Sequence, residues 1–135
     1  MMSRIVFCNG AFDILHVGHV ELLNHAKGLG DLLVVALDSD RRIRQHKGVS
    51  RPVNPIDVRR TIMENIKPVD VVEEFDSDEQ LINLLVRYDP DIRVIGSDWK
   101  NGNIVGAEYS GEIVFYERIN GQSTTKTIQN IIDRR

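Results

Sequence analysis

Apolar and polar positions alternate along the chain with two periods, one typical of strands and one typical of helices. Five short apolar runs predict β-strands, at residues 4–8, 31–37, 69–75, 92–95 and 111–117. After four of them, apolar residues three or four positions apart predict amphipathic helices. Strands that alternate with helices indicate a parallel sheet covered on both faces. We therefore expect one α/β domain over residues 1–135, with a Rossmann-like doubly wound parallel sheet of about five strands.

Polar loops follow three of the predicted strands, at Gly10–His19, Gly96–Lys100 and Arg118–Thr125. In parallel sheets, ligands bind beyond the carboxyl ends of the strands, near the point where the strand order reverses. Since all three loops follow strands in this way, the sequence predicts that they converge on one binding site.

The composition narrows the class of protein. The 135 residues are 41% hydrophobic, enough for one domain with its own core. A net charge of -3 argues against a general nucleic-acid-binding surface, and no apolar run is long enough to predict a membrane span. The chain begins with a predicted strand rather than a signal peptide, so we expect a soluble cytoplasmic protein. Cys8, the only cysteine, lies in a predicted strand and is expected to be buried, without a catalytic role.

His16 and His19 lie three residues apart at the predicted start of the first helix. Histidines at this spacing share one helix face, where they are often ordinary surface or core residues, or half of a metal site. The sequence offers no cluster of Cys, His or Asp that would complete a metal site. A helix start also carries backbone N–H groups that favour phosphate, so a phosphate site is the third interpretation.

Basic residues cluster between positions 41 and 51 of this acidic protein, at Arg41, Arg42, Arg44, His46, Lys47 and Arg51. Such a run is commonly a solvated helix face. Gly48, Pro52 and Pro55 indicate that a loop follows, and a basic loop near a phosphate site is also a candidate lid. Both interpretations stay open at this stage.

Two motifs in the chain resemble a known family. Gly10-Ala-Phe-Asp-Ile-Leu-His-Val-Gly-His19 contains the H-x-G-H pattern at a strand-to-helix turn, as in the cytidylyltransferase-like nucleotidylyltransferases. Arg118-Ile-Asn-Gly-Gln-Ser-Thr-Thr125 resembles the R-T-E-G-I-S-T-T element of the glycerol-3-phosphate cytidylyltransferases, and departs from it at Ile119, Asn120 and Gln122. The resemblance extends over nearly the whole chain.

Two branches of this family share features with the sequence. Lys47-Gly-Val-Ser-Arg-Pro-Val-Asn-Pro55 and Ile104-Val-Gly-Ala-Glu108 resemble the domain that makes ADP-heptose from D-glycero-β-D-manno-heptose 1-phosphate and ATP. Asp98, Trp99, Arg118 and the short segment between residues 100 and 112 are more similar to the glycerol-3-phosphate cytidylyltransferases, which use CTP. The heptose-type adenylyltransferase is the preferred interpretation.

The resemblance implies that an acceptor phosphate attacks the α-phosphorus of a nucleoside triphosphate and that pyrophosphate leaves. The attacking oxygen is already anionic, so the protein positions the reactants and neutralises charge. The implied catalytic residues are His16, His19, Lys47 and Arg118. The implied nucleotide-binding residues are Gly10, Ala11, Phe12, Gly18, Arg59, Asp98, Gly121, Ser123 and Thr124.

Four residues that the resemblance concerns also have structural interpretations. Asp13 matches an acceptor-binding position of the family, and is as readily a helix cap. Ser123 combines a cap position with phosphate binding, and Phe12 is equally well a core residue. Trp99 either stacks on the nucleotide or covers the sheet edge.

The resemblance also implies cofactors and partners. Mg²⁺ is expected to arrive with the nucleoside triphosphate, because no carboxylate cluster indicates a dedicated protein site. A nucleoside triphosphate and a small phosphorylated acceptor are the expected partners, with no nucleic acid and no membrane, and the chain is expected to form a homodimer. A second class of function, a nucleotide-binding module without catalysis, would share the same phosphate sites.

Overall fold

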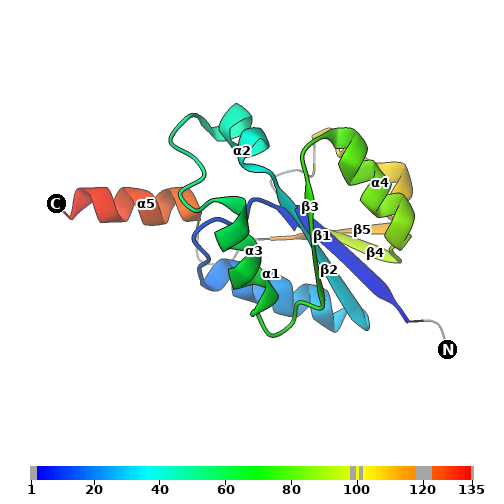
Figure 1. Cartoon of the computed structure of the whole chain (residues 1–135). Helices are drawn as coiled ribbons and strands as arrows, with labels where there is room; N and C mark the ends of the chain where they lie inside the picture. The colour runs from blue at the N-terminus through cyan, green and yellow to red at the C-terminus, as the bar shows by residue number, and fades with distance from the viewer. Residues whose placement is uncertain (1–2, 98–99, 101, 118–122, 135) are drawn as a thin grey trace.

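The computed structural model describes residues 3–97, 100, 102–117 and 123–134. Its centre is a sheet of five parallel strands in the order β3-β2-β1-β4-β5 (Figure 1). The strands are β1 (Ile5–Gly10), β2 (Leu32–Asp38), β3 (Val71–Phe75), β4 (Ile92–Gly96) and β5 (Glu112–Tyr116). The chain moves outward from β1 to β3 and then returns to β4 on the other side of β1. The strand order therefore reverses between β1 and β4, which is where such folds bind ligands.

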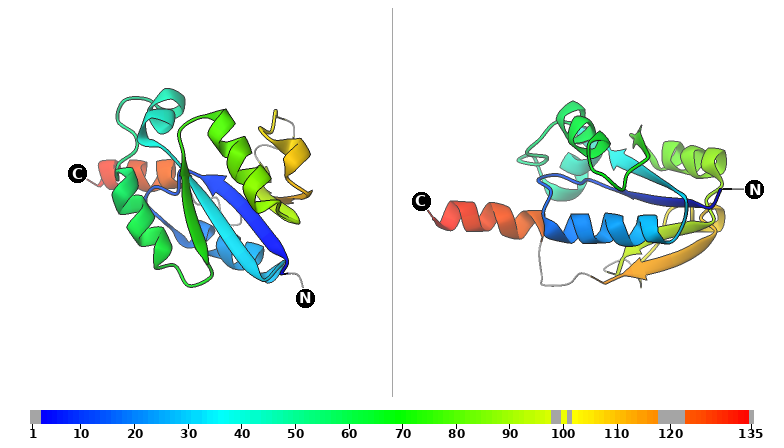
Figure 2. Two further views of the ribbon diagram at one scale, coloured as in Figure 1. Left: turned by 45° about the vertical axis from the view of Figure 1, so that its right-hand side comes forward. Right: turned by 90° about the horizontal axis from the view of Figure 1, so that it is seen from below.

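Helices cover both faces of this sheet (Figure 2). They are α1 (Val17–Gly28), α2 (Asp40–Lys47), α3 (Ile56–Glu64), α4 (Asp78–Tyr88) and α5 (Thr124–Asp133). Leu23 of α1 and Met63 of α3 are buried with Cys8 against one face. Leu81 and Leu85 of α4 are buried with Phe7 and other residues against the opposite face. The predicted parallel sheet with helices on both faces is confirmed.

Element boundaries differ from the prediction by one or two residues: β1 ends later than the predicted run, whereas β3 begins later, at Val71. β1 continues to Gly10, two residues beyond the predicted run, because Asn9 and Gly10 remain in register with Ala36 and Leu37 of β2. The basic segment divides into two parts, with a helix over residues 40–47 and a loop from Gly48. Ile43 is the buried residue of that helix, so the interpretation as a helix face applies to residues 41–47.

The last helix, α5, extends away from the sheet (Figures 1 and 2). Only its first residue, Thr124, is buried, whereas Ile131 and Ile132 are more than half exposed. The body of the protein therefore supports α5 at its beginning alone. Among the described helices, none combines the length and apolar character that crossing a bilayer requires.

Candidate functional site

A cavity of about 720 Å³ lies at the carboxyl edge of the sheet. Its lining includes residues of the loop after β1, the end of β4 and the start of α5. A volume of this size is typical of small-molecule sites. In the described part of the chain, the predicted convergence of the polar loops is therefore observed.

The turn from β1 into α1 is strained. Phe12 and Ile14 adopt φ angles of 48° and 51°, in the left-handed region that a β-branched residue such as Ile rarely enters. Gly10 precedes them, and a Cβ atom added there would lie 3.2 Å from the Phe12 ring. Phe12 both lines the cavity and packs against the core, so its two expected roles are compatible.

His16 and His19 organise the start of α1. Nδ1 of His16 accepts a hydrogen bond from the N–H of Gly18 at 3.1 Å, and Nδ1 of His19 accepts one from the N–H of His16 at 3.2 Å. This reciprocal pair is a capping box in which histidines replace the usual Ser and Glu. Because each Nδ1 is an acceptor, each neutral ring carries its proton on Nε2. The two rings lie 3.9 Å apart, and the His19 ring also contacts Phe12.

This cap changes the expected source of the phosphate donors. The N–H of Gly18 is bonded to the His16 ring, and the N–H of His19 is bonded to the His16 carbonyl at 3.0 Å. The helix start therefore does not offer these two N–H groups to a ligand. Both histidines and Gly18 line the cavity, so the imidazole rings belong to the part of this turn that faces a ligand.

Asp13 holds the loop that follows α2. Its carboxylate is almost fully buried and accepts hydrogen bonds from the N–H groups of Val53 at 2.6 Å and Asn54 at 3.0 Å. Both oxygens are thereby engaged by the protein itself. The helix cap is His16 rather than Asp13. Asp13 anchors the loop through its carboxylate and also lines the cavity.

The start of α5 joins this turn from the other side. The Ser123 side chain caps the helix by accepting a hydrogen bond from the N–H of Lys126 at 3.0 Å. This agrees with the interpretation of Ser123 as a helix cap. The Thr124 hydroxyl donates to the backbone carbonyl of Asp13. Ser123 keeps a hydroxyl proton that it can donate to a ligand, whereas the proton of Thr124 is used within the protein. Both residues line the cavity.

Two of the expected basic residues have different surroundings. Lys47, at the end of α2, lines the cavity as expected. Arg59 does not line it, and its side chain is fully buried. Its guanidinium donates to the carbonyls of Asn54 at 3.0 Å and Ala11 at 2.9 Å, and to the Asp40 carboxylate at 2.7 Å. The expected phosphate contact of Arg59 is thus replaced by bonds that join the first turn, α2 and the loop.

Arg51 is a candidate that the sequence reasoning did not single out. It lines the cavity with a side chain only 10% exposed, and its Nη1 donates to the Thr125 hydroxyl at 3.2 Å. Nε and Nη2 are buried and lack hydrogen-bond partners among the described residues. Nε lies 3.9 Å from the Asp13 carboxylate. Its place within the basic cluster was the available signal, but the pattern gave no reason to choose it over its neighbours.

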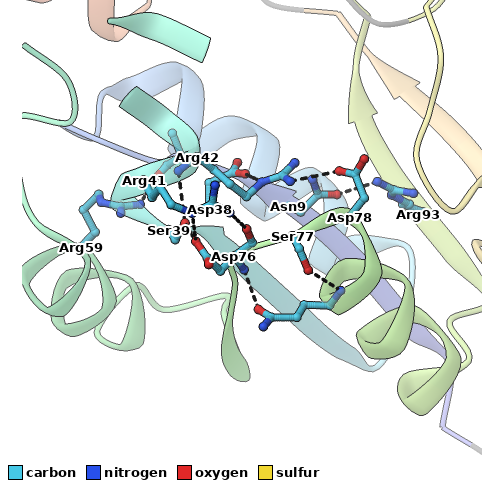
Figure 3. Close-up of polar contacts among 12 residues, drawn as sticks. Asn9, Asp38, Ser39, Arg41, Arg42, Arg59, Asp76, Ser77, Asp78 and Arg93 are labelled. Carbon is cyan, nitrogen blue, oxygen red and sulfur yellow. Dashed lines mark hydrogen bonds and ion pairs between the residues drawn. The ribbon is translucent and has the colours of Figure 1, made fainter. Parts of the chain in front are cut away.

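Further polar residues line the cavity on the side of α4. They are Asn9, Asp38, Arg42, Asp78 and Arg93 (Figure 3). Arg42 donates to Asp38 and to Asp78, each at 3.0 Å. Burial lowers the pKa of Arg42, but these two carboxylates outweigh it, and the net pKa is raised. These residues come from five separate elements, so no sequence motif indicated them.

Three predicted site residues, Asp98, Arg118 and Gly121, lie outside the described residues, as does Trp99. Gly10 and Ala11 line the cavity. Burial raises the pKa of the Cys8 thiol to about 12, so this cysteine is un-ionised at neutral pH and is not an activated nucleophile. No group of three or more potential metal ligands occurs among the described side chains.

Comparison with known proteins agrees with this geometry. The profile of the Cytidylyltransferase-like family matches residues 7–130. The bifunctional protein HldE of Helicobacter hepaticus is 43% identical over 129 residues, which are 96% of this chain and 27% of that protein. HldE of Campylobacter concisus is 43% identical over 131 residues, 97% of this chain and 28% of that protein. The chain thus spans roughly a quarter of the length of these relatives.

Two solved structures share the fold of this chain. The lipopolysaccharide core biosynthesis protein of Thermoplasma volcanium is 25% identical and superposes with a TM-score of 0.74, over 88% of this chain and all of that one. A pantoate-beta-alanine ligase from Francisella tularensis, 15% identical with a TM-score of 0.59, shares the fold over 98% of this chain and 71% of its own. From the family profile and the histidine-bearing turn at the cavity, we conclude that the chain belongs to the Cytidylyltransferase-like family of nucleotidyltransferases.

Proposed function

We propose that the cavity catalyses transfer of a nucleoside monophosphate from a nucleoside triphosphate to the phosphate of a small sugar or polyol phosphate. The observation that carries this proposal is the orientation of the two histidines. Their Nδ1 atoms accept hydrogen bonds from the backbone of α1, and both rings line a cavity whose lining also includes the start of α5.

The chemistry follows from these groups. An oxygen of the acceptor phosphate forms a bond to the α-phosphorus while the bond from that phosphorus to the bridging oxygen breaks, and pyrophosphate leaves with the electron pair. No proton must be removed from the acceptor oxygen, so no general base is required. His16 and His19 donate to the phosphate oxygens on which charge increases, and a charge-assisted hydrogen bond of this kind contributes about 1.5–3 kcal/mol.

Basic residues hold the leaving group. Lys47 and Arg51 both line the cavity, and two nitrogens of Arg51 lack hydrogen-bond partners within the described residues. We assign these side chains, with Ser123 and the backbone at the start of α5, to the β- and γ-phosphates. Arg118 joins them by the resemblance of its motif. Mg²⁺ enters with the triphosphate, held by phosphate oxygens and water.

The preferred substrates are ATP and a heptose 1-phosphate, with CTP and glycerol 3-phosphate as the alternative. The stretch Lys47–Pro55 supports the first pair through its resemblance to heptose-type adenylyltransferases. It is also the stretch whose Val53 and Asn54 are bound to Asp13, so its sequence bears directly on the shape of the site. The similarities of Asp98, Trp99 and Arg118 support the second pair.

A paired screen tests both the reaction and its specificity. Pyrophosphate release is measured with ATP and with CTP, each against D-glycero-β-D-manno-heptose 1-phosphate and glycerol 3-phosphate, with Mg²⁺ present. We expect release with ATP and the heptose phosphate, and none without an acceptor. Release with CTP and glycerol 3-phosphate would select the alternative pair. Binding of nucleotide without release from any pair would instead support the non-catalytic module.

We also propose that the protein is a homodimer in the cytoplasm and that it binds neither nucleic acid nor membranes. Support for the dimer comes from α5, where Ile131 and Ile132 are 59% and 52% exposed on a helix that extends from the body. A lone ten-residue helix is marginal in water, so a second copy would stabilise it. Sedimentation should show a dimer that Ile131→Lys weakens, while an unchanged monomer in both proteins would contradict the proposal.

A further inference from the structure

The cavity has a second polar side that the proposed phosphate chemistry does not use. We call it the α4-side wall and define it as Asn9, Asp38, Arg42, Asp78 and Arg93, all of which line the cavity (Figure 3). Asn9 follows Phe7 by two residues, and Asp38 follows Ala36 by two. Phe7 and Ala36 pack under α4, so the two polar side chains continue that face of the sheet.

Arg93 is a buried cation at the base of this wall. Only 3% of its surface is exposed. No carboxylate among the described residues lies within ion-pair distance of it. Burial lowers its pKa to about 10, so it still carries its charge at neutral pH. Its Nη1 donates to the Val105 carbonyl at 2.6 Å and to the Ser110 hydroxyl at 3.1 Å, while its Nε has no hydrogen-bond partner in the described part of the chain.

The remaining contact of Arg93 fixes the orientation of Asn9. Nη2 of Arg93 donates to Oδ1 of Asn9 at 2.8 Å. Since a guanidinium can only donate, the oxygen of the Asn9 amide must face Arg93 and its NH₂ group must face away. No described protein group accepts from that NH₂, and Asn9 lines the cavity. Arg93 therefore positions the Asn9 amide, with its oxygen toward the guanidinium and its two N–H donors away from it.

The charges of the α4-side wall balance. Asp38 and Asp78 carry two negative charges, and Arg42 and Arg93 carry two positive ones. Arg42 is bonded to both carboxylates, which retain further lone pairs as acceptors. A neutral surface with fixed donors beside fixed acceptors is poorly suited to a phosphate. It is well suited to hydroxyl groups, each of which donates one hydrogen bond and accepts others.

We infer that the α4-side wall is the subsite that binds the hydroxyl groups of the phosphorylated acceptor, with the Asn9 amide, oriented by Arg93, as its donor. The inference rests on the proposed function. In-line transfer places the attacking and leaving oxygens on opposite sides of the α-phosphorus. Because the proposed function places the leaving pyrophosphate at Lys47, Arg51 and the start of α5, the acceptor has the α4 side available to it.

The ribose of the nucleotide also carries hydroxyl groups that the α4-side wall could bind. Binding measurements distinguish the ribose from the acceptor. Calorimetry on the full chain compares glycerol 3-phosphate and heptose 1-phosphate with inorganic phosphate, which has no carbon-bound hydroxyls. The variants are Asn9→Leu, of similar volume without hydrogen-bonding groups, and Arg93→Met. Asn83→Leu and Arg87→Met, exposed on α4, are the matched controls. Thermal unfolding checks that each variant is folded.

We expect Asn9→Leu and Arg93→Met to weaken binding of whichever polyol phosphate the wild type binds more tightly by about tenfold or more. This is the effect of losing one or two hydrogen bonds. Binding of inorganic phosphate should change by less than about twofold. The controls should bind as the wild type does. Equal losses for inorganic phosphate, or no loss at all, would overturn the inference. A loss seen with ATP and absent with 2′-deoxy-ATP would assign the wall to the ribose and would also overturn it.

These titrations do not depend on turnover. If the wild type binds polyol phosphates through the wall but releases no pyrophosphate, the proposed reaction fails and the hydroxyl site stands. If pyrophosphate is released while Asn9→Leu and Arg93→Met bind the acceptor normally, the reaction stands and the hydroxyl site fails. A folded Asn9→Leu variant suffices for this decision should Arg93→Met not fold.

Discussion

The hydroxyl of Thr124 donates a hydrogen bond to the backbone carbonyl of Asp13, 111 residues earlier in the chain. Asp13 belongs to the strained turn before α1, and Thr124 is the first residue of α5. The two motifs that resemble the nucleotidyltransferase family are thus directly bonded. Because α5 is buried only at this residue, the contact determines where the start of α5 lies relative to the histidines.

Thr124→Val tests this connection, since valine keeps the shape and removes the hydroxyl. We expect the free energy of unfolding to fall by about 1 kcal/mol or more, because the Asp13 carbonyl loses a buried donor. Turnover should fall too, since the start of α5 is no longer held. Urea unfolding and pyrophosphate release measure the two effects. Thr61→Val, which removes an exposed hydroxyl bonded within α3, is the control, and identical behaviour of the two variants would contradict the role of Thr124.

His16→Asn separates the two functions of His16. Asparagine can still accept from the N–H of Gly18, so α1 keeps its cap, but it has no group in the position of Nε2. We expect turnover to fall by about a hundredfold or more, with an unfolding free energy close to that of the wild type. His16→Ala should lose the same activity and in addition about 1 kcal/mol of stability. Near-normal turnover in His16→Asn would rule out the donor role.

Arg51→Met removes the guanidinium whose Nε and Nη2 lack partners in the described structure. If these groups bind the triphosphate, the KM for the nucleotide should rise by about tenfold or more, as expected for loss of a charge-assisted bond. The KM for the acceptor should change much less. Initial rates with each substrate varied in turn measure this difference. Arg44→Met, at an exposed residue of α2 outside the cavity lining, controls for the change in net charge.

Asp70→Asn tests the pH dependence of stability. Burial raises the pKa of Asp70, but hydrogen bonds from Lys27 and from the N–H of Leu33 outweigh it, so the net pKa is lowered. A carboxylate with a lowered pKa stabilises the fold above its ordinary pKa, and this contribution is lost as the pH falls through the lowered value. Asp70 is 32% exposed, so we expect a contribution below about 1 kcal/mol.

Urea unfolding between about pH 5 and pH 3 checks this expectation. The wild type should lose stability more steeply than Asp70→Asn over that range. Glu112→Gln, which removes an exposed carboxylate without a described ion pair, is the control. Parallel curves for the wild type and Asp70→Asn would show that the Lys27 and Leu33 contacts add nothing.

Local patterns in the sequence predicted the elements and the position of the site. Apolar periodicity gave five strands and the helices around them, and the H-x-G-H turn placed two histidines at the start of α1. These features depend on residues close together in the chain. The use of His16 and His19 as a reciprocal cap was not expected, because Ser, Thr, Asp and Asn are the usual caps. Asp13 was considered instead.

Those local patterns did not predict contacts between residues far apart in the chain. Arg59 was expected to reach phosphate because its position matches the family. Its actual partners, Ala11 and Asp40, are known only once α2 and the first turn are folded together. Arg93 lies 84 residues from Asn9, and nothing in either strand indicates that the two side chains meet. Pairings of this kind depend on the strand order, which apolar patterns do not specify.

The left-handed conformations of Phe12 and Ile14 bear on how the protein folds. Each costs about 1–3 kcal/mol, and the compensating bonds join Asp13 to residues 40 and 41 positions later and to Thr124. Contacts between residues so far apart form slowly, because a long loop must close before they stabilise anything. The turn should therefore reach its final geometry only after the sheet has assembled. Although its sequence motif is short and local, the histidine site is expected to be among the last parts of the molecule to form.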